Sequence, residues 1–404
     1  MRKIDLNDFQ VATSETARDI NRRIVLNLIR SHQPISRADL ARHSGLQRST
    51  VSVITEQLIN ERWVTEGAIG HVLRGRRPRF LHLNKERAGI IGINIRPTHT
   101  VVALADLDAH FVSQEALPTS RDPEQFVAEL GRRIRNMTRM RSEVSYEGIG
   151  VSLPGRVDLG SQRLVFAPNL GWSQFDLKTP LEQVTGLPVE LENAANACAL
   201  AEVWFGRHTE GVSNLIAVTV SEGIGTGLIL NQQLVRGTTG LAGEFGHISV
   251  VDDGIECRCG NRGCWEVYAS NTAAVRYYSQ STSNGRNDKL SARAAGPELA
   301  FDDIVRLAKQ NDPKAVDSIN KMAHYLGVGI ALLITGLAPD VIVVIGEVTR
   351  VWNQVGAVIN QVIRERSRTH AVTRIVPTDP AIQPRLQGTI ALVLQKHFGA
   401  PSVA

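Results

Sequence analysis

The chain has 404 residues, 43% of them hydrophobic, and a formal net charge of +5 at pH 7. This length is sufficient for two or three domains, each with its own core. No apolar run reaches the roughly 18 residues of a membrane helix, and the first residues lack the apolar core of a signal peptide. We therefore expect a cytoplasmic protein with no membrane insertion.

Positive charge is concentrated near the N-terminus. Residues 1–87 contain 16 Lys or Arg and 9 Asp or Glu, an excess of seven positive charges. Because the whole chain carries +5, the remainder carries a net charge of −2. A basic module attached to a slightly acidic body is typical of a nucleic-acid binder with a regulatory domain.

Helical periodicity begins after a short N-terminal arm, residues 1–15. Apolar residues at helical spacing predict a helix over 16–31. A second helix, with Ser36 as its expected N-cap, is separated by Gly45 from a third that ends near Asn60. A helix, a glycine turn and a helix make up the helix-turn-helix arrangement.

The next segment reads as two strands joined by a basic tip, Arg-Gly-Arg-Arg-Pro-Arg over 74–79. Four arginines so close together would repel one another without an anion nearby, which favours contact with phosphates or a narrow minor groove. We therefore predict a winged helix-turn-helix DNA-binding domain over 16–86. Short polar residues with Gln and Arg at a helix N-terminus can reach base edges, although a solvated helix face is the plainer alternative. The side chains expected to contact DNA are Ser36, Arg37, Gln47, Arg48, Ser49, Thr50, Ser52, Arg74, Arg76, Arg77 and Arg79.

From residue 89 the pattern changes to an alternation of strands and helices. The predicted strands are 89–96, 100–106, 146–153, 188–192, 214–220, 227–230 and 341–345, and the predicted helices 126–141, 194–204, 326–337 and 390–397. Two hairpins of strands, one in each half, suggest a duplicated α/β unit. Glycines at 223, 225 and 227 indicate a loop between two of the strands, and 278–298 is expected to be a mobile loop or insertion.

Three of the four cysteines, Cys257, Cys259 and Cys264, follow His247 within one glycine-rich stretch. Buried thiols or a disulfide are the alternatives, but glycines surround these residues and the cytosol keeps thiols reduced. One imidazole and three thiolates can complete a tetrahedral shell, so we expect one structural Zn²⁺ per chain, with no open position for catalysis. The remaining cysteine, Cys198, lies in an apolar stretch and is expected to be buried and inert.

The motifs Gly-Glu244-Phe-Gly-His247 and Cys257-x-Cys259-Gly-x-x-Gly-Cys264-x-Glu266, after a winged helix-turn-helix, resemble the ROK family (repressors, open reading frames and kinases). The resemblance covers nearly the whole chain. It implies an α/β fold, in which the winged helix-turn-helix is followed by a two-lobed, actin-like or sugar-kinase-like ROK domain with a structural zinc loop. Lobe one would span about 87–190 plus the C-terminal helix 386–399, and lobe two about 191–385, including the zinc loop 247–266.

The same resemblance implies a homodimeric or homotetrameric bacterial repressor, associated with the nucleoid when it binds operator DNA. Such repressors are tuned by a sugar, a sugar phosphate or a partner protein. The positions that would contact sugar by this resemblance are Gly155, Asn193, Glu244, His247 and Glu266.

The chain departs from the kinases of this family at the residues that would handle phosphate. The expected phosphate loop Gly-Ile-Asp-x-Gly-Gly-Thr-Lys becomes 92–99, with Asn94 for the acid and Arg96-Pro97 for the two glycines. Proline offers no N–H to a phosphate. The expected catalytic Asp is Ala194, which cannot accept a proton, and a carboxylate, Glu347, follows Gly346 in the nucleotide-side glycine run.

We therefore predict an effector-regulated transcriptional repressor without enzymatic activity. Two alternatives stay open: a sugar kinase with a DNA-binding module, and a repressor controlled by a protein partner with an empty sugar pocket.

Overall fold

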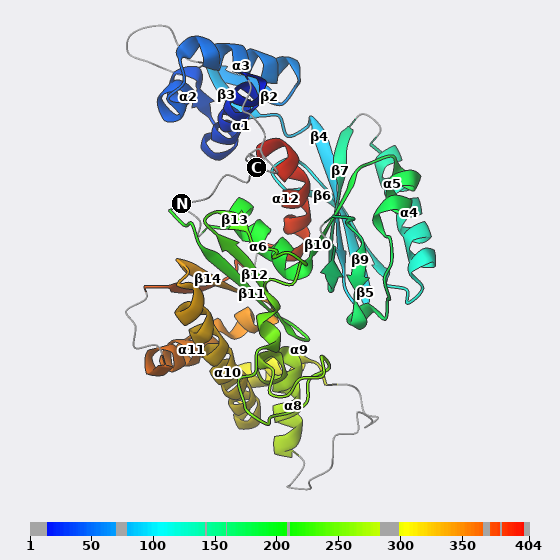
Figure 1. Ribbon diagram of the computed structural model, residues 1–404, viewed down its shortest axis with the longest axis vertical. Helices are drawn as coiled ribbons and strands as arrows, with labels where there is room; N and C mark the ends of the chain where they lie inside the picture. Colours follow the sequence, from blue (N-terminus) through cyan, green and yellow to red (C-terminus); the bar gives the residue numbers. More distant parts are fainter. Residues whose placement is uncertain are drawn as a thin grey trace.

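The computed structural model describes residues 14–69, 79–141, 144–158, 160–207, 211–282, 299–366, 372–379 and 382–399. A small domain, here called the head (residues 14–69 and 79–83), lies above a larger α/β body (residues 88–399), as Figure 1 shows. Within these described residues no helix is both long and apolar enough to span a bilayer.

The head combines three helices with a three-stranded sheet of order β1-β3-β2. Val25, Leu26, Ile29, Leu40 and Leu58 are among its fully buried side chains. Its elements are α1 (Ser14–His32), β1 (Ile35–Ser36), α2 (Arg37–Ser44), α3 (Arg48–Asn60), β2 (Val64–Ile69) and β3 (Arg79–Leu83).

The ends of α2 form as the sequence predicts. The hydroxyl of Ser36 accepts a hydrogen bond from the backbone N–H of Asp39 at 3.2 Å, which satisfies one of the free N–H groups of the first turn. Gly45 adopts a left-handed conformation (φ 71°) at the other end, a conformation that costs glycine little. Gln47 is the N-cap of α3, so this helix starts slightly later than predicted.

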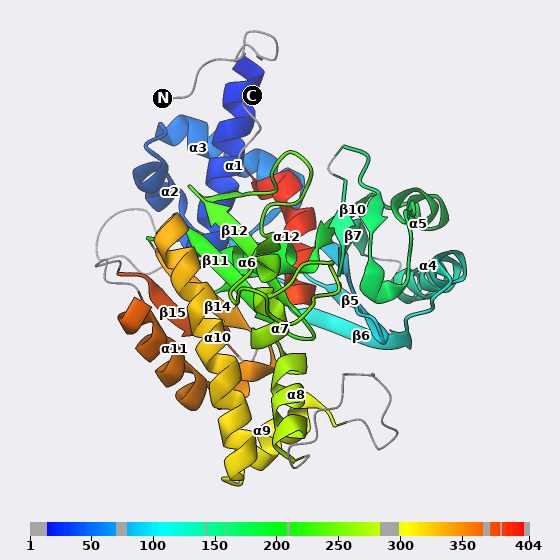
Figure 2. The same ribbon diagram turned by 60° about the horizontal axis from the view of Figure 1, so that its bottom comes forward.

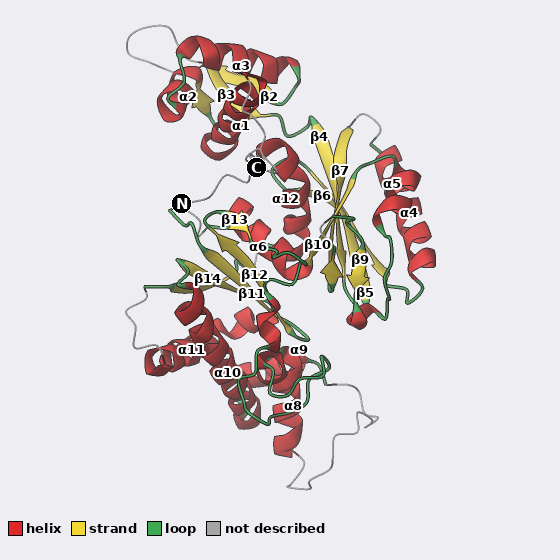
Figure 3. Cartoon of the chain, in the orientation of Figure 1, coloured by secondary structure: helices red, strands yellow, loops and turns green. Residues whose placement is uncertain are grey.

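The first sheet of the body has the order β10-β7-β4-β5-β6. Helices α4 (Pro123–Arg139) and α5 (Lys178–Thr185) cover its outer face (Figure 3). Its strands are β4 (Ala88–Ile95), β5 (His99–Ala105), β6 (Phe111–Pro118), β7 (Ser145–Leu153) and β10 (Val189–Asn193). A small ribbon, β8 (Arg156–Val157) with β9 (Leu164–Phe166), and the 3₁₀ turn η1 (Pro168–Leu170) connect β7 to α5.

The second sheet has the order β13-β12-β11-β14-β15. The strands are β11 (Leu215–Val220), β12 (Ile224–Leu230), β13 (Gln233–Leu234), β14 (Val341–Ile345) and β15 (Arg374–Pro377). The helices and turns around it are η2 (Glu244–His247), α7 (Trp265–Ala269), α8 (Asn271–Thr282), α9 (Phe301–Lys309), α10 (Pro313–Leu337), η3 (Glu347–Val351) and α11 (Trp352–Arg366).

The two sheets repeat one topology. Each begins with an antiparallel hairpin, β4–β5 or β11–β12, and adds two parallel strands beside the first strand of that hairpin. The duplicated α/β unit expected from the sequence is therefore present. Here the half of the body built on the first sheet is called lobe one, and the half built on the second sheet lobe two.

The glycine segment 223–227 differs from the expected loop, because β12 already begins at Ile224. A Cβ at Gly227 would lie 2.3 Å from the carbonyl oxygen of Ala195, and a Cβ at Gly225 would lie 2.8 Å from the Thr219 hydroxyl. These glycines let a helix pack directly on the strand.

Two helices fill the space between the sheets: α6 (Ala194–Phe205) and α12 (Pro384–Phe398). They lie side by side in Figures 1 and 2. Their contact is close, because a Cβ at Gly388 would lie 1.9 Å from the carbonyl oxygen of Ala197. On its other side α12 contacts lobe one, where a Cβ at Gly150 would lie 2.0 Å from the carbonyl oxygen of Thr389.

The head is anchored on the far ends of these two helices. The Asn27 amide donates to the carbonyl oxygen of Phe398 at 2.6 Å, and Arg30 donates to that of Trp204 at 3.3 Å. The Arg30 guanidinium also lies 4.7 Å from the centroid of the Trp204 ring. Trp63 of the head packs against His397 and Phe398, with ring centroids 4.6 and 5.9 Å apart.

Candidate functional site

The four predicted metal ligands come together on one loop of lobe two. Their ligand atoms all lie within 4.8 Å of one another. Cys257 Sγ is 3.7 Å from His247 Nδ1, and the Sγ atoms of Cys259 and Cys264 are 3.6 Å apart. Zinc bonds of about 2.3 Å to sulfur and about 2.0–2.1 Å to nitrogen give tetrahedral edges of about 3.5–3.8 Å, so the donor set fits a tetrahedral metal ion.

Backbone constraints hold this loop in shape. Gly263 has φ 76°, and a Cβ there would lie only 1.8 Å from the carbonyl oxygen of Val251. Cys264 is the N-cap residue of α7, and the next residue, Trp265, donates its indole N–H to Tyr325 O of α10 at 2.8 Å. The metal-ligand loop is therefore attached directly to α7 and, through Trp265, to α10.

Cys198 is fully buried in α6 and is not part of the metal cluster. Burial raises the pKa of its thiol to about 12, so the thiol stays protonated near neutral pH. The prediction that Cys198 is buried is confirmed.

A cavity of about 410 Å³ lies between the lobes, beside the metal cluster. This volume is within the range of small-molecule sites, about 300–1,000 Å³. All five residues predicted to contact sugar line it: Gly155, Asn193, Glu244, His247 and Glu266. The structure thus brings residues that are up to 111 positions apart, from Gly155 to Glu266, to the lining of one cavity.

His247 connects the metal cluster to the cavity. Its Nδ1 faces Cys257 and lies 3.6 Å from Oε1 of Glu266, whereas its Nε2 lies 3.7 Å from Oε2 of Glu244. A metal bound at Nδ1 would leave Nε2–H free to donate, because the two ring nitrogens are distinct ligands. Glu244, whose side chain is 50% exposed, offers its carboxylate to the cavity.

Asn193 is used mainly within the protein. Its side-chain oxygen caps α6 by accepting from Ala195 N–H at 2.8 Å, and its amide donates to the carbonyl oxygen of Gly155 at 2.8 Å. These bonds hold the start of α6 against the turn after β7. Ala194, the first residue of that helix, faces the cavity with a methyl group only.

The other departures from a kinase site also have structural partners. Asn94 accepts a hydrogen bond from the Ser152 hydroxyl at 3.1 Å. Gly346 has φ 130°, and a Cβ there would lie 2.0 Å from the carbonyl oxygen of Val220, so both the backbone conformation and the packing require glycine at this position. Arg96 Nη2 lies 3.8 Å from carboxylate oxygens of both Glu222 and Glu347.

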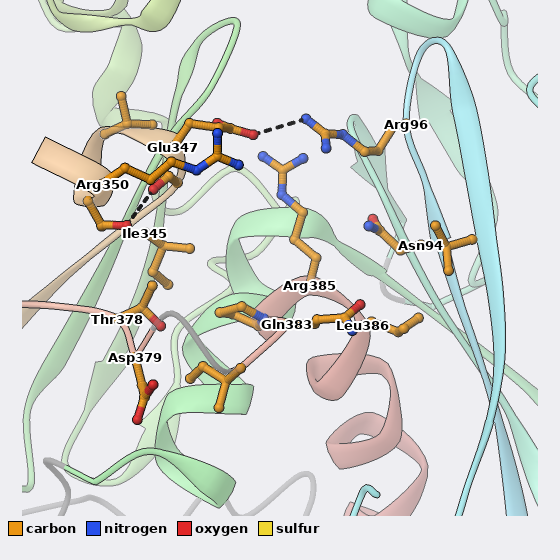
Figure 4. Close-up of a pocket in the computed structure, with 16 residues that line it drawn as sticks. Asn94, Arg96, Ile345, Glu347, Arg350, Thr378, Asp379, Gln383, Arg385 and Leu386 are labelled. Atoms are coloured by element: carbon orange, nitrogen blue, oxygen red, sulfur yellow. Dashed lines mark hydrogen bonds and ion pairs between the residues drawn. The ribbon is translucent and has the colours of Figure 1, made fainter. Parts of the chain in front are cut away.

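A second cavity, of about 300 Å³, opens beside the first (Figure 4). Arg385, at the start of α12, lines both cavities, and no spacing in the sequence indicated it, because its position depends on how two distant segments pack. Burial opposes ionisation of the nearby Glu222. A backbone hydrogen bond and the charges of Arg96 and Arg385 nevertheless keep its pKa below the ordinary value.

In the head, the first turn of α3 presents polar side chains to solvent. Gln47, Arg48, Ser49 and Ser52 are exposed, and Thr50 is half-buried. Behind them Val51, Ile54 and Leu58 are buried in the head core. This is the predicted arrangement of a recognition helix.

The structure alters the expected set of DNA contacts at the start of α2. Ser36 is only 5% exposed and its hydroxyl caps α2, so it is not available to DNA, contrary to the prediction. Arg37 is held inside the head by Thr55 at 3.0 Å and Glu66 at 2.7 Å. Arg79 is exposed and pairs with Glu66 at 2.7 Å, and these hydrogen bonds from Arg79 and Arg37 lower the pKa of Glu66. Arg74, Arg76 and Arg77 lie outside the described residues.

Both parts of the chain, the head and the two-lobed body, resemble parts of known proteins. Residues 18–65 match the model for a winged helix-turn-helix DNA-binding domain, and residues 90–396 match the model of the ROK family. The chain belongs to the ROK family.

The relatives include both regulators and enzymes. The chain is 33% identical to a xylose repressor of Bacillus subtilis, over 82% of this chain and 83% of that protein. It is 37% identical to a glucokinase of Streptomyces coelicolor over 63% of this chain and 81% of that enzyme. A crystal structure of a ROK family transcriptional regulator, a homologue of the E. coli MLC protein, superposes with a TM-score of 0.81 at 27% identity, covering 95% of this chain and 98% of that one.

Proposed function

We propose that this protein is a sequence-specific DNA-binding transcriptional repressor. A sugar or sugar derivative, bound in the cavity between the lobes, controls its affinity for operator DNA. We further propose that it has no kinase activity. The similarity to a xylose repressor and the winged helix-turn-helix head support the first statement, and Ala194 supports the last.

One observation carries the proposal: α6 and α12 both begin at the cavity and both end against the head. Ala194 and Arg385, in the first turns of the two helices, line the cavity. Trp204 and Phe398, in their last turns, accept hydrogen bonds from α1 of the head. A ligand that moves the first turns therefore moves the support on which the head rests.

The two helices can transmit a displacement because they are packed as one unit. The close approach at Gly388 leaves no room for α12 to slide independently of α6. A ligand shifts the equilibrium between two arrangements only as far as its affinity for them differs. A sugar that binds more tightly to the arrangement with low DNA affinity would cause release of the operator. A sugar that binds more tightly to the other arrangement would strengthen operator binding.

The cavity wall supplies the groups that recognise sugar hydroxyls. Carboxylates of Glu244 and Glu266 would accept hydrogen bonds, and His247 Nε2–H would donate one. A zinc ion at the His247–Cys257–Cys259–Cys264 cluster would supply rigidity to this wall, with its shell filled by protein ligands.

In the head, the first turn of α3 would read base edges through Gln47, Arg48, Ser49, Thr50 and Ser52. Arg79, with Arg74, Arg76 and Arg77 of the wing, would contact phosphates. Two-fold related heads of a homodimer, or of a homotetramer, would bind half-sites in a palindromic operator. Sedimentation equilibrium distinguishes the two oligomers.

The direct experiment is a gel-shift titration on the DNA upstream of the protein's own gene, at moderate salt, with and without a panel of sugars. We expect specific binding that at least one sugar changes. Glu244→Gln should bind the operator like the wild type but lose the sugar response. Arg48→Ala should lose specific operator binding but still show the thermal shift with the sugar. Absence of specific DNA binding would overturn the proposal.

The same panel of sugars distinguishes the proposed repressor from the two alternatives, a sugar kinase and a repressor controlled by a protein partner. Phosphoryl transfer from ATP to any sugar, measured in a coupled assay, would show that Ala194 does not prevent catalysis. Intact operator binding with no sugar response, and no thermal shift with any sugar, would favour control by a protein partner.

A further inference from the structure

The two cavities described above share two residues, Arg96 from the end of β4 in lobe one and Arg385 from the first turn of α12. Figure 4 shows both guanidinium groups pointing into the space between the lobes. A ligand that fills the larger cavity and extends toward the second must pass between them.

These two arginines keep free hydrogen-bonding capacity. Arg385 donates to the neutral hydroxyl of Ser221 at 3.1 Å and also contacts the Cys198 thiol. Its charge lowers the pKa of Glu222, but no carboxylate of the described residues forms an ion pair with it within 4.0 Å. Arg96 faces Glu222 and Glu347 at 3.8 Å, which is too long for a direct hydrogen bond. Since a guanidinium has five N–H donors, most of the donors here remain available.

The third arginine of the second cavity, Arg350, is better paired. Arg350 Nη1 lies 2.7 Å from the carboxylate of Asp302. Glu347, which faces Arg96, already accepts a hydrogen bond from the Asn271 amide at 3.0 Å. The junction is therefore the place at which an incoming anion would gain the most.

The helix behind Arg385 adds to this preference. Gln383, the N-cap of α12, makes no side-chain capping bond, and Pro384 occupies the first turn. The positive end of a 15-residue helix is thus directed at the same junction, uncompensated by a capping carboxylate.

We propose that the effector is an anionic carbohydrate, whose phosphate or carboxylate is held by Arg96 and Arg385 at the junction of the two cavities. This inference rests on the proposed function. The sugar hydroxyls would lie near Glu244 and Glu266, and the charged group would reach across the cavity to the arginine pair. The ion pairs of Arg96 with Glu222 and Glu347 of lobe two would then be replaced by hydrogen bonds to the ligand. The charged group of the ligand would thereby connect Arg96 of lobe one with Arg385 of α12.

The experiment is isothermal titration of the full-length protein with matched sugars. Glucose, mannose, N-acetylglucosamine and N-acetylmannosamine are each compared with the corresponding 6-phosphate, and glucose also with glucuronate, which separates phosphate from carboxylate. Inorganic phosphate alone is the control for non-specific anion binding. In at least one pair, we expect the anionic member to bind on the order of tenfold or more tightly, because charge-assisted hydrogen bonds are the stronger ones.

The variants Arg96→Gln and Arg385→Gln test the assignment. Each should reduce the preference for the anionic member toward unity while leaving the affinity for the neutral sugar within about twofold. Arg350→Gln, in the same cavity but paired with Asp302, should keep the preference. Retained operator binding by each variant shows that the protein is folded.

Three outcomes would overturn the inference. The first is that neutral sugars bind as well as their anionic partners in every pair. The second is that the Arg96 and Arg385 variants weaken neutral and anionic sugars equally, as expected of a purely structural bridge between the lobes. The third is that the preference disappears instead in Arg156→Gln, whose side chain lines only the larger cavity and has a buried Nε without a hydrogen-bond partner. If no sugar of any kind binds, the proposed sugar effector itself fails, which is a distinguishable result.

Discussion

Ala194 lines the cavity with a methyl group, at the position that we propose corresponds to the catalytic base of kinases in this family. A single substitution could restore the carboxylate there. We expect that this would not restore phosphoryl transfer, because Pro97, which also lines the cavity, has no N–H to offer a phosphate.

We therefore expect Ala194→Asp to show no sugar phosphorylation above background. The measurement is a coupled ATP assay across hexoses and amino sugars, with a ROK glucokinase as the positive control. Turnover clearly above that of the wild-type protein would show that the acid alone had been missing.

The metal cluster allows a matched comparison of cysteines. Cys259→Ser removes one of four metal ligands, so we expect metal analysis to fall from one ion per chain to none. Loss of the bound metal should lower the free energy of unfolding by on the order of 3 kcal/mol. Cys198→Ser makes the same chemical change in a buried position outside the cluster, and should keep the ion. Full metal content in the Cys259 variant would contradict the assignment.

At the scale of single residues, the sequence predicted those sites whose residues carry their own chemistry in a short motif. The His247 and cysteine cluster is such a case, and its ligand atoms do converge. Arg385 was not predictable, because a lone arginine in a helix has no pattern and gains its role only from the packing of α12 between the lobes. For Ser36 the sequence predicted a role that the structure does not support. This polar residue was predicted to contact DNA, but its hydroxyl caps the N-terminus of α2.

Among the secondary-structure elements, the contact of α6 with α12 depends on a residue without a side chain. Gly388 lies within α12, where glycine is intrinsically unfavourable by about 0.5–1 kcal/mol relative to alanine. Glycine is nevertheless required at position 388, because a Cβ there would lie only 1.9 Å from the carbonyl oxygen of Ala197. The backbone atom cannot move aside as a flexible side chain could.

Gly388→Ala is accordingly expected to destabilise the protein by about 1–3 kcal/mol, the usual cost of overpacking. Gly336→Ala is the matched control, because Gly336 also lies in a helix, α10, but has no atom within 4 Å of its added Cβ. That control should be neutral or more stable by about 0.5 kcal/mol. Urea unfolding of both variants measures these changes in the free energy of unfolding. Equal stability of the two variants would contradict the prediction, because it would mean that α12 can move away from α6 at no cost.

Strand and helix patterns predicted seven strands and four helices of the body, about half of those that the structure describes, and two of the differences in bounds have clear causes. α10 begins at Pro313, well before the predicted start at 326, because Asp312 caps it by accepting from Ala315 N–H at 2.8 Å. Its first half carries more polar residues and was therefore not recognised as the same helix. β12 was shortened in the prediction because glycines were taken as a loop, whereas they permit α6 to approach.

For the whole molecule, stability against acid should depend on the place where head and body meet. Glu147 lies there, 2.8 Å from His397, and it also pairs with Arg87. The hydrogen bond from His397, opposed by burial and supported by Arg87, lowers the pKa of Glu147 from 4.5 to about 2. Because the folded-state pKa is depressed, the stabilisation is complete above about pH 4.5 and is lost as the pH falls toward 2.

We expect Glu147→Gln to be less stable than the wild type at pH 6, by up to on the order of 3 kcal/mol. The difference should shrink as the pH is lowered below 4.5. Chemical unfolding at a series of pH values measures it. A constant difference between the two proteins over that range would show that Glu147 does not titrate with folding.

The position of α12 has a consequence for how the protein is made. Its residues Ile390, Val393 and Phe398 belong to one hydrophobic cluster with β4, at Ala88 and Ile90, and with the head. A ribosome must therefore extend the chain as far as Phe398 before the first sheet receives its inner cover or the head its anchor. Until then, the hydrophobic cluster that the head shares with the body is incomplete, and so is the connection between the cavity and the head. The last segment to be synthesised is therefore the one that joins the head to the ligand-binding body.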